Sequence, residues 1–376
     1  MIAGKVFRGI SVTGSKTEIV VVGGGIMGLL SARELALGGA RVTLVERGEC
    51  GRESSWAGGG IVSPLYPWRY REPIHTLARW SQAHYPALVE QLERESGINA
   101  EWQPSGMLML DVKDRTEALA WADAHDQAMQ QLEAAQLPSV EPALASGRHG
   151  LWMPDIGQVR NPRLVRAARQ ALAGHGIELR EHTEVEGLIA ERGQLRGIHT
   201  SQGDIYAQHV VVAGGAWSGR LLQDLGLTID IRPVKGQMIL YRTQPGTIQR
   251  IVLKDGKYVI PRRDGHVLAG STMENTDFDK TTTEQAQHEL RQAAEALFPV
   301  LADAPLVKHW AGLRPGSPEG IPYIGEYPTL RGLFVNAGHF RNGVVMGPAS
   351  ARLLADLVLE RKTIVDSAPY ALEASR

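Results

Sequence analysis

The chain has 376 residues with 40 basic and 41 acidic side chains, so its formal net charge is -1. This balance gives no reason to expect a nucleic-acid or anionic-membrane partner, and the length exceeds the size at which single cores usually stop growing. Cys50 is the one cysteine, which excludes an intramolecular disulfide and a cysteine-built zinc site and fits a reducing compartment. We therefore expect a cytoplasmic protein of two domains without a metal site.

Residues 1 to 17 carry three basic side chains and no acid, but they lack the continuous apolar core of a secretory signal. We expect a poorly ordered tail there, and a targeting role is the alternative. The most apolar stretch, residues 19 to 30, is broken by four glycines and is too short to cross a bilayer. No contact with a membrane is therefore expected.

The chain is organised around residues 19 to 46. An apolar run from Ile19 to Val22 leads into a glycine-rich turn and a helix-forming stretch that ends at Leu37. A second apolar run, Val42 to Val45, is closed by Glu46. The pattern predicts a strand, a tight turn, a helix, a second strand and an acid, which is the order of a dinucleotide-binding unit.

The glycines of this turn match the G-x-G-x-x-G pattern. The first allows the turn, the second lets the backbone approach a pyrophosphate, and the third lets the helix pack on the strand. The helix N-terminus offers free N–H groups to the phosphates, and Glu46 has the spacing of the acid that accepts hydrogen bonds from a ribose. An ordinary glycine-rich loop is the alternative. The expected cofactor contacts are Gly23, Gly25, Ile26, Met27, Gly28 and Glu46.

A second glycine-rich stretch follows at residues 47 to 61, where small side chains would let the backbone pass close to a long ligand. A flexible linker is the alternative. Here the chain resembles the FAD-dependent amine and amino-acid oxidases of the D-amino-acid oxidase superfamily, in which an R-x(n)-S-S-x-A-x-x-G segment runs beside the diphosphate and flavin. The resemblance implies cofactor contacts from Arg47, Ser54, Ser55, Gly59, Gly60 and Ile61.

The middle of the chain reads as alternating helices and strands. Apolar spacing predicts helices over residues 72–97 and 114–135, with a strand over 106–112 between them. A helix is predicted over 161–173, where an Asn-Pro pair starts it. The strands expected next cover residues 178–180, 185–191, 197–200 and 205–212, and a helix is expected over 217–225. The same resemblance implies that Val185 covers the adenine and that Gly214 and Trp217 close this domain over the cofactor.

Between residues 231 and 268 the sequence changes to short strands separated by Pro and Gly, which predicts an antiparallel sheet that roofs the flavin. The segments at residues 232–237, 257–262 and 269–274 resemble the R-P-x-x-G-Q, Y-x-x-P-R and G-x-T-x-E elements of glycine and sarcosine oxidases. Without that resemblance Tyr258 would be assigned a structural role.

The C-terminal third carries W-A-G-L-R-P at residues 310–315, then a predicted strand at 333–336, and then G-H-F-R-N-G at 338–343 as a turn into a helix predicted over 344–359. These motifs resemble those of glycine oxidases, the thiamine-pathway members of the superfamily, and the resemblance covers nearly the whole chain after residue 17. The alternatives are that Arg314 forms a surface salt bridge and that Gly343 only marks the start of a helix. A helix that begins there would direct its N-terminal dipole at a reduced flavin. The implied cofactor contacts are His339, Phe340, Arg341, Asn342, Gly343 and Val344.

The resemblance implies oxidation of glycine and other small amines or amino acids, including sarcosine, N-substituted glycines and small D-amino acids, with non-covalent FAD. A hydride passes from Cα to flavin N5, the imine is hydrolysed, and oxygen is reduced to hydrogen peroxide. Arg314 is expected to bind the carboxylate with two parallel bonds. By position, Tyr258 adds a hydroxyl, Met273 lines the small pocket and Arg341 lies on the flavin face. Gly256 replaces a histidine common in the family, which leaves the pocket more open.

The expected fold is an α/β FAD-binding Rossmann-type domain plus an α+β substrate domain with a mainly antiparallel sheet, as in D-amino-acid oxidase. We assign residues 18–95, 150–228 and 325–365 to the first domain, 96–149 and 229–324 to the second, and 366–376 to a tail. A homotetramer is implied by the resemblance. Two other functions remain open: a D-amino-acid dehydrogenase that passes electrons to a quinone, and a non-catalytic FAD-binding module. Oxygen uptake with peroxide release separates the oxidase from the dehydrogenase.

Overall fold

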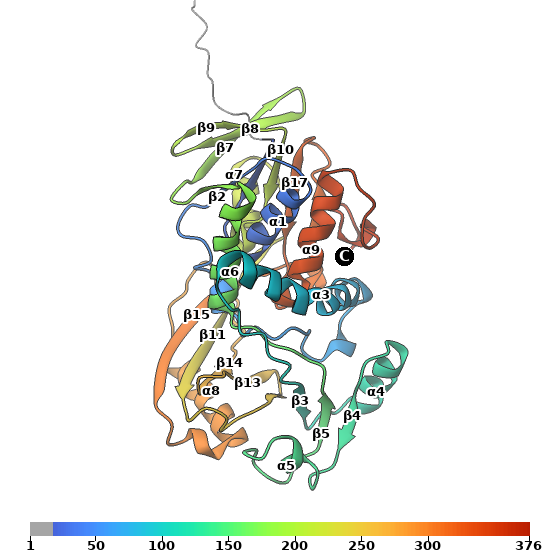
Figure 1. Cartoon of the computed structure of the whole chain (residues 1–376), viewed down its shortest axis with the longest axis vertical. Coiled ribbons are helices and arrows are strands. Elements are labelled where there is room, and N and C mark those ends of the chain that lie inside the picture. Colours follow the sequence, from blue (N-terminus) through green and yellow to red (C-terminus); the bar gives the residue numbers. More distant parts are fainter. Residues whose placement is uncertain (1–17) are drawn as a thin grey trace, which may run out of the picture.

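The computed structural model describes residues 18–376, and it consists of two lobes built on two sheets (Figure 1). The tail expected at residues 1–17 lies outside the described residues. Within residues 18–376 no helix has both the length and the apolar character needed to cross a membrane. The same residues contain no group of three or more His, Cys, Asp or Glu side chains that could hold a metal ion.

The sheet of the first lobe has six strands in the order β16-β17-β10-β1-β2-β6, so β1 is an inner strand of this sheet. Its strands are parallel except for the antiparallel β16–β17 pair. The inner strands are buried on both faces, which explains why they are mostly apolar along their length. Their bounds are β1 Ile19–Val22, β2 Val42–Val45, β6 Glu178–Arg180, β10 His209–Val212, β16 Tyr323–Glu326 and β17 Leu333–Ala337.

Helices pack on one face of this sheet and a small antiparallel sheet packs on the other, as two separate apolar cores show. The helical layer holds α1 Ile26–Leu37, α3 Glu72–Ser96, α6 Asn161–Ala171 and α9 Gly343–Val358. The small sheet holds β7 Val185–Glu191, β8 Gln194–Thr200 and β9 Gly203–Tyr206. Two short helices, α2 Ser54–Ala57 and α7 Ser218–Asp224, lie in the connections.

The second lobe is an eight-stranded sheet in the order β15-β11-β14-β13-β12-β3-β5-β4, and only the β12–β3 pair is parallel. The long strands β11 and β15 run from the first lobe into the second (Figure 1). Helix α8 covers one face of this sheet through a shared apolar core. The bounds are β3 Met107–Leu110, α4 Arg115–Ala124, β4 Gln130–Leu132, α5 Leu137–Val140, β5 Gly150–Met153, β11 Arg232–Arg242, β12 Ile251–Lys254, β13 Lys257–Pro261, β14 His266–Gly270, α8 Glu284–Leu297 and β15 Leu306–Gly316.

This architecture confirms the expected fold class, and the helix predicted over residues 72–97 is α3. The single helix predicted over 114–135 is wrong. Helix α4 ends at Ala124, and Gln130–Leu132 forms the edge strand β4 on β5. The strand predicted over 205–212 divides, because β9 pairs with β8 while β10 pairs with β1. Tertiary pairing overrides local propensity in both places.

Two of the expected domain limits also differ from the sheets. Strand β5, residues 150–153, pairs with β3 and β4 of the second lobe, although we placed residue 150 in the first domain. The segment assigned as a tail, residues 366–376, is packed: Tyr370 is 1% exposed and donates to the Pro73 carbonyl at 2.8 Å. Arg376 lies over the Tyr323 ring at 3.6 Å. The remaining division into two domains stays a prediction.

Candidate active site

A cavity of about 700 Å³ lies between the two lobes. The turn after β1 and the segment from Glu46 to Ser63 line it from the first lobe, while β11, β13 and β15 line it from the second. The expected residues that line this cavity are Gly23, Gly25, Ile26, Met27, Glu46, Arg47, Ser54, Ser55, Gly59, Gly60, Ile61, Val185, Gly214, Trp217, Tyr258, Arg314, His339, Phe340, Arg341, Gly343 and Val344. The fold therefore brings distant motifs to one site, and their individual roles stay predictions.

The glycine turn is held in a shape that other residues would not adopt. Gly23 has φ +111, and a Cβ there would lie 2.6 Å from the Ala213 carbonyl oxygen. A Cβ on Gly28 would lie 1.8 Å from the Gly23 carbonyl oxygen, so Gly28 permits the helix to pack on the turn and does not itself line the cavity. These contacts match the roles that the G-x-G-x-x-G pattern gives to its first and third glycines.

Glu46 at the end of β2 fixes the backbone around the cavity. Its Oε2 accepts a hydrogen bond from Gly24 N at 2.7 Å, and its Oε1 accepts one from Gly48 N at 2.9 Å. Each carboxylate oxygen keeps a further lone pair, so the same group can accept bonds from a ribose diol.

Helix α1 begins at this turn, and Ser55 takes one of its free N–H groups. The Ser55 Oγ accepts a hydrogen bond from Ile26 N at 2.9 Å. Beside it, the Arg47 guanidinium lies over the Trp217 ring at 4.3 Å. Phe278 packs on the same tryptophan, with 5.4 Å between ring centroids, and Lys280 pairs with Glu53 at 3.0 Å. The 278–280 segment of the second lobe thus packs on residues that line this end of the cavity.

A buried arginine supports the backbone of the second glycine-rich stretch. Arg262 donates to the Gly59 carbonyl at 2.7 Å, to Val159 O at 2.9 Å and to Gln158 Oε1 at 2.6 Å. Burial lowers the pKa of Arg262 to about 10. Gly60 has φ +82, and a Cβ there would lie 2.0 Å from Val159 O, so this segment packs directly against the backbone of its neighbour.

The G-H-F-R-N-G turn places the N-terminus of α9 at the cavity. Gly343 and Val344, the first residues of the helix, both line it. His339 is buried, its Nε2 lies 3.0 Å from Ser350 Oγ, and burial lowers its pKa to about 3. It is therefore neutral at physiological pH. Asn342 is the N-cap residue and is buried behind the cavity wall, not in it.

Arg314 projects from β15 into the other end of the cavity. Its Nη2 donates to Ser271 Oγ at 2.6 Å and its Nη1 donates to the Thr272 carbonyl at 3.2 Å. The ion pairs formed within residues 18–376 do not include Arg314. Burial lowers the pKa of this guanidinium, because the charged form is kept from water. An arginine without an acidic partner in a cavity wall is suited to bind an anionic ligand.

Two residues at this end differ from expectation. Met273 is 58% exposed and does not line the cavity, whereas Met238 of β11 does, with its Sδ 3.8 Å from the Tyr258 hydroxyl. A lone methionine in a strand gives no sequence signal, so Met238 was missed. Arg262 was part of a recognised motif but had no assigned role, because its contact with Gly59 joins residues far apart in the chain.

The donors of this cavity fit FAD. Glu46 and the α1 N-terminus would hold the ribose and diphosphate, since they offer carboxylate oxygens and free backbone N–H groups. The segment 58–61 and the start of α9 would flank the flavin ring, where glycines leave the backbone open to the cavity. The Arg314 and Tyr258 side chains would then lie on the substrate side.

Comparison with known proteins agrees with this geometry. A family model described as DAO, FAD-dependent oxidoreductase, matches residues 18–357. The chain is similar to glycine oxidase of Pseudomonas aeruginosa, with 53% identity over 94% of this chain and 98% of that one. It is also similar to the bifunctional protein ThiO/ThiG of Synechocystis sp., with 33% identity over 92% of this chain and 52% of that protein. The crystal structure of glycine oxidase from Geobacillus kaustophilus superposes with a TM-score of 0.91 at 32% identity, covering 96% of this chain and 99% of that chain.

Proposed function

The chain belongs to the DAO family of FAD-dependent oxidoreductases, and from this premise we propose that it oxidises glycine and other small amino acids or amines. When bound, FAD would supply the two-electron chemistry, that is, hydride acceptance from the substrate Cα and reduction of oxygen to hydrogen peroxide. Hydrolysis of the imine then gives an oxo acid and ammonia or an amine.

The main observation behind the proposed substrate class is the position of the Arg314 guanidinium. It lines the substrate end of the cavity, has no acidic partner among residues 18–376, and keeps N–H groups for a ligand. A planar guanidinium binds a carboxylate with two parallel charge-assisted bonds, which also fixes the direction of the Cα–H bond. Tyr258 lies beside it and can add a hydroxyl bond to the same carboxylate.

The other residues of the site orient and shield the substrate. Met238, Ile61 and Leu65 give this end of the cavity apolar walls, which exclude water around the reacting carbon. Gly256, at the place where the family often has a histidine, presents no side chain. Sarcosine, N-substituted glycines and small D-amino acids are therefore proposed as substrates beside glycine.

Replacing Arg314 tests the substrate class. We expect Arg314→Ala to lower kcat/KM for glycine roughly 30-fold to several thousand-fold, because a buried carboxylate left unpaired costs about 2–5 kcal/mol. Arg314→Lys should recover only part of the loss, since a point charge cannot form the fork. The measurement is peroxide production with glycine and with methylamine, which lacks the carboxylate.

A matched control is Arg232→Ala, on the neighbouring strand β11 at an exposed position. It should behave as the parent. Equal losses for glycine and methylamine in Arg314→Ala would mean that this arginine acts on the flavin or the fold, and the amino-acid assignment would lose its main support. Oxygen uptake without a quinone separates this oxidase from the dehydrogenase alternative.

Several finer assignments are also proposals. The thiamine pathway is supported by the similarity to a bifunctional ThiO/ThiG protein. A homotetramer rests on the resemblance alone, and light scattering of the purified protein tests it. A cytoplasmic location rests on the single cysteine and the composition.

A further inference from the structure

The Nη end of the Arg314 guanidinium lies against a glycine of the neighbouring strand. A Cβ built on Gly236 would fall 2.2 Å from both Nη atoms of Arg314 and 2.4 Å from its Cζ. Strand β11 pairs with β15 here, with Val234 opposite Arg314. The backbone of β11 therefore limits where the Nη atoms can lie, because only a hydrogen atom of Gly236 fits beside them.

Within its own plane the guanidinium is held by the segment that follows β14. Nη2 donates to Ser271 Oγ at 2.6 Å, and Nη1 donates to the Thr272 carbonyl at 3.2 Å. A guanidinium has five N–H groups, so N–H groups remain for a ligand beyond these two bonds. One anchor is a backbone carbonyl that every residue carries, whereas the other is a side-chain hydroxyl that a substitution can remove.

The segment that carries this hydroxyl is itself tied to two strands. Lys257 of β13 donates to the Ser271 carbonyl at 3.0 Å, and Thr272 Oγ1 accepts from Gln237 N of β11 at 2.9 Å. Glu274 exchanges two backbone bonds of 2.9 Å with Lys235 and also pairs with its ammonium at 3.1 Å. Ser271 is thus a fixed point, not a loop residue that adjusts to the arginine.

We propose that Ser271 is a positioning residue for Arg314: together with Gly236, which limits where the Nη atoms can lie, it fixes the orientation of the guanidinium so that the remaining N–H groups meet a carboxylate in the cavity. Without this hydroxyl the guanidinium keeps one in-plane bond and can rotate, so ligand binding must first order it. The inference rests on the proposed function in one respect: it takes the ligand of Arg314 to be a carboxylate.

The test compares the FAD-loaded parent with Ser271→Ala and Ser271→Thr. The first probe is acetate, a carboxylate without an amine, whose dissociation constant is read from the change in flavin absorbance. The second is anaerobic flavin reduction by glycine, which gives an apparent dissociation constant and a limiting rate. We expect Ser271→Ala to weaken acetate and glycine binding about 10- to 150-fold, the range for a hydrogen bond to a charged group, with a much smaller change in the limiting rate.

The controls separate positioning from a general loss of structure. Ser271→Thr keeps the hydroxyl and should restore binding, and methylamine should react equally with the parent and Ser271→Ala. Thr276→Ala removes a hydroxyl of the same segment that bonds the Asp277 carbonyl, and it should match the parent. If Ser271 acts through Arg314, adding Ser271→Ala to Arg314→Lys should weaken acetate binding less than it does in the parent.

Unchanged acetate binding in Ser271→Ala, or a full additional loss in the Arg314→Lys background, would overturn the positioning role. The outcome for the proposed function is independent. Suppose that glycine fails to reduce the flavin of the parent while Ser271→Ala still weakens acetate binding. That result would refute the glycine oxidase function and leave the positioning role intact. A parent that binds no acetate would refute the carboxylate site and with it this inference.

Discussion

Glu46 illustrates how one side chain can serve both the fold and a ligand. Its two oxygens hold the backbone N–H groups of Gly24 and Gly48, so it shapes the turn that lines the cofactor cavity. The sequence pattern gave Glu46 a single role, as the ribose acid. The structure adds that removing the carboxylate also removes the hydrogen bonds that hold the backbone at Gly24 and at Gly48.

We therefore expect Glu46→Arg to weaken FAD binding about 10- to 100-fold, because the ribose loses its acceptor and the backbone at Gly24 and at Gly48 loses its bond to the carboxylate. Titration of the apoprotein with FAD, followed by flavin fluorescence, measures this. Glu191→Arg, at an exposed position of β7, is the matched charge change and should bind FAD normally. If Glu46→Arg is purified with a full complement of FAD, the ribose assignment is wrong.

His339 makes stability depend on pH below about pH 6.5, and the upper part of this window lies above the range in which most carboxylates titrate. The folded protein binds its proton only near pH 3, whereas an unfolded histidine binds one near pH 6.5. Between these values the unfolded state holds more protons, so the free energy of unfolding falls as pH falls, by up to about 1.4 kcal/mol per pH unit.

We expect His339→Asn to flatten this slope between pH 6.5 and about pH 5, measured by urea unfolding of the FAD-loaded enzyme at fixed FAD concentration. The exposed His288 of α8 provides the control, since His288→Asn should leave the slope of the parent. An unchanged slope in His339→Asn would show that other groups cause the acid sensitivity.

Helix α9 carries a proline in its second turn, and a neighbouring helix compensates for it. Pro348 has no N–H, so the carbonyl of Val344, four residues earlier, cannot form its helical bond. Tyr85 of α3 donates its hydroxyl to this carbonyl at 3.0 Å. Because Val344 lines the cavity, the α3–α9 contact supports the helix end that faces the cofactor.

Tyr85→Phe should lower the free energy of unfolding by about 1–3 kcal/mol, the cost of leaving a buried carbonyl unpaired. Chemical denaturation of the FAD-loaded protein measures this loss. Tyr206→Phe, at a side chain that is 60% exposed, removes a hydroxyl without that consequence. Equal stability of Tyr85→Phe and the parent would mean that the Val344 carbonyl finds another donor.

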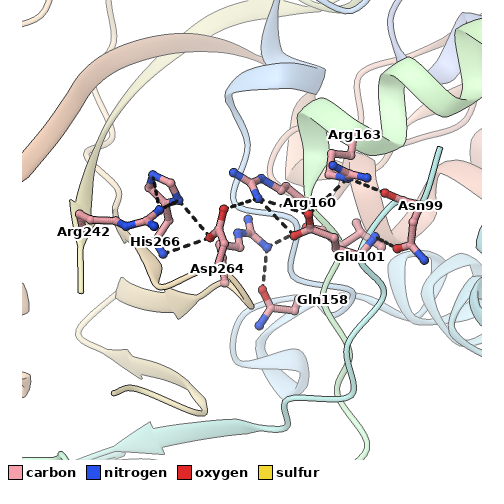
Figure 2. A network of polar contacts seen from close by, with 10 residues as sticks. Asn99, Glu101, Gln158, Arg160, Arg163, Arg242, Asp264 and His266 are labelled. Atoms are coloured by element: carbon pink, nitrogen blue, oxygen red, sulfur yellow. Dashed lines mark hydrogen bonds and ion pairs between the residues drawn. The ribbon is translucent and has the colours of Figure 1, made fainter. Parts of the chain in front are cut away.

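The whole molecule places the cofactor cavity between two lobes that polar contacts join. Arg160, just before α6, pairs with Glu101 at 3.3 Å and with Asp264 of the β13–β14 turn at 2.8 Å. Figure 2 shows Glu101 between Arg160 and Arg163, with Asp264 directed to Arg160 and His266. This network lies next to the Gln158 and Arg262 pair that holds Gly59, so it also steadies the cavity wall.

The position of the one cysteine predicts how the flavin is held. Cys50 is buried behind the glycine turn, where a Cβ on Gly24 would lie 2.3 Å from its Sγ, and it does not line the cavity. Burial raises the pKa of this thiol, so it is a poor nucleophile. Acid precipitation of the holoenzyme should release all the yellow colour into the supernatant, and colour kept in the pellet would point to a histidine linkage.

The sequence by itself determined the features that depend on neighbours along the chain. The strand-turn-helix-strand unit, its glycines and Glu46 lie within 28 residues, so their spacing alone predicts a dinucleotide site. The conjunction of motifs after it identified the family, and the cavity contains most of the residues those motifs named. Glycine and strand patterns act locally, so the conformation of such a segment can be predicted from its own residues.

The tertiary structure alone decided which distant side chains meet. Met273 was expected in the pocket, but the path of the segment after β14 exposes it and the β11–β15 pairing brings Met238 there instead. The same pairing sets Gly236 against the Nη atoms of Arg314, and the segment after β14 brings Ser271 to its side. Residues so far apart in the chain become neighbours only through strand register, which long-range packing fixes and local sequence does not encode.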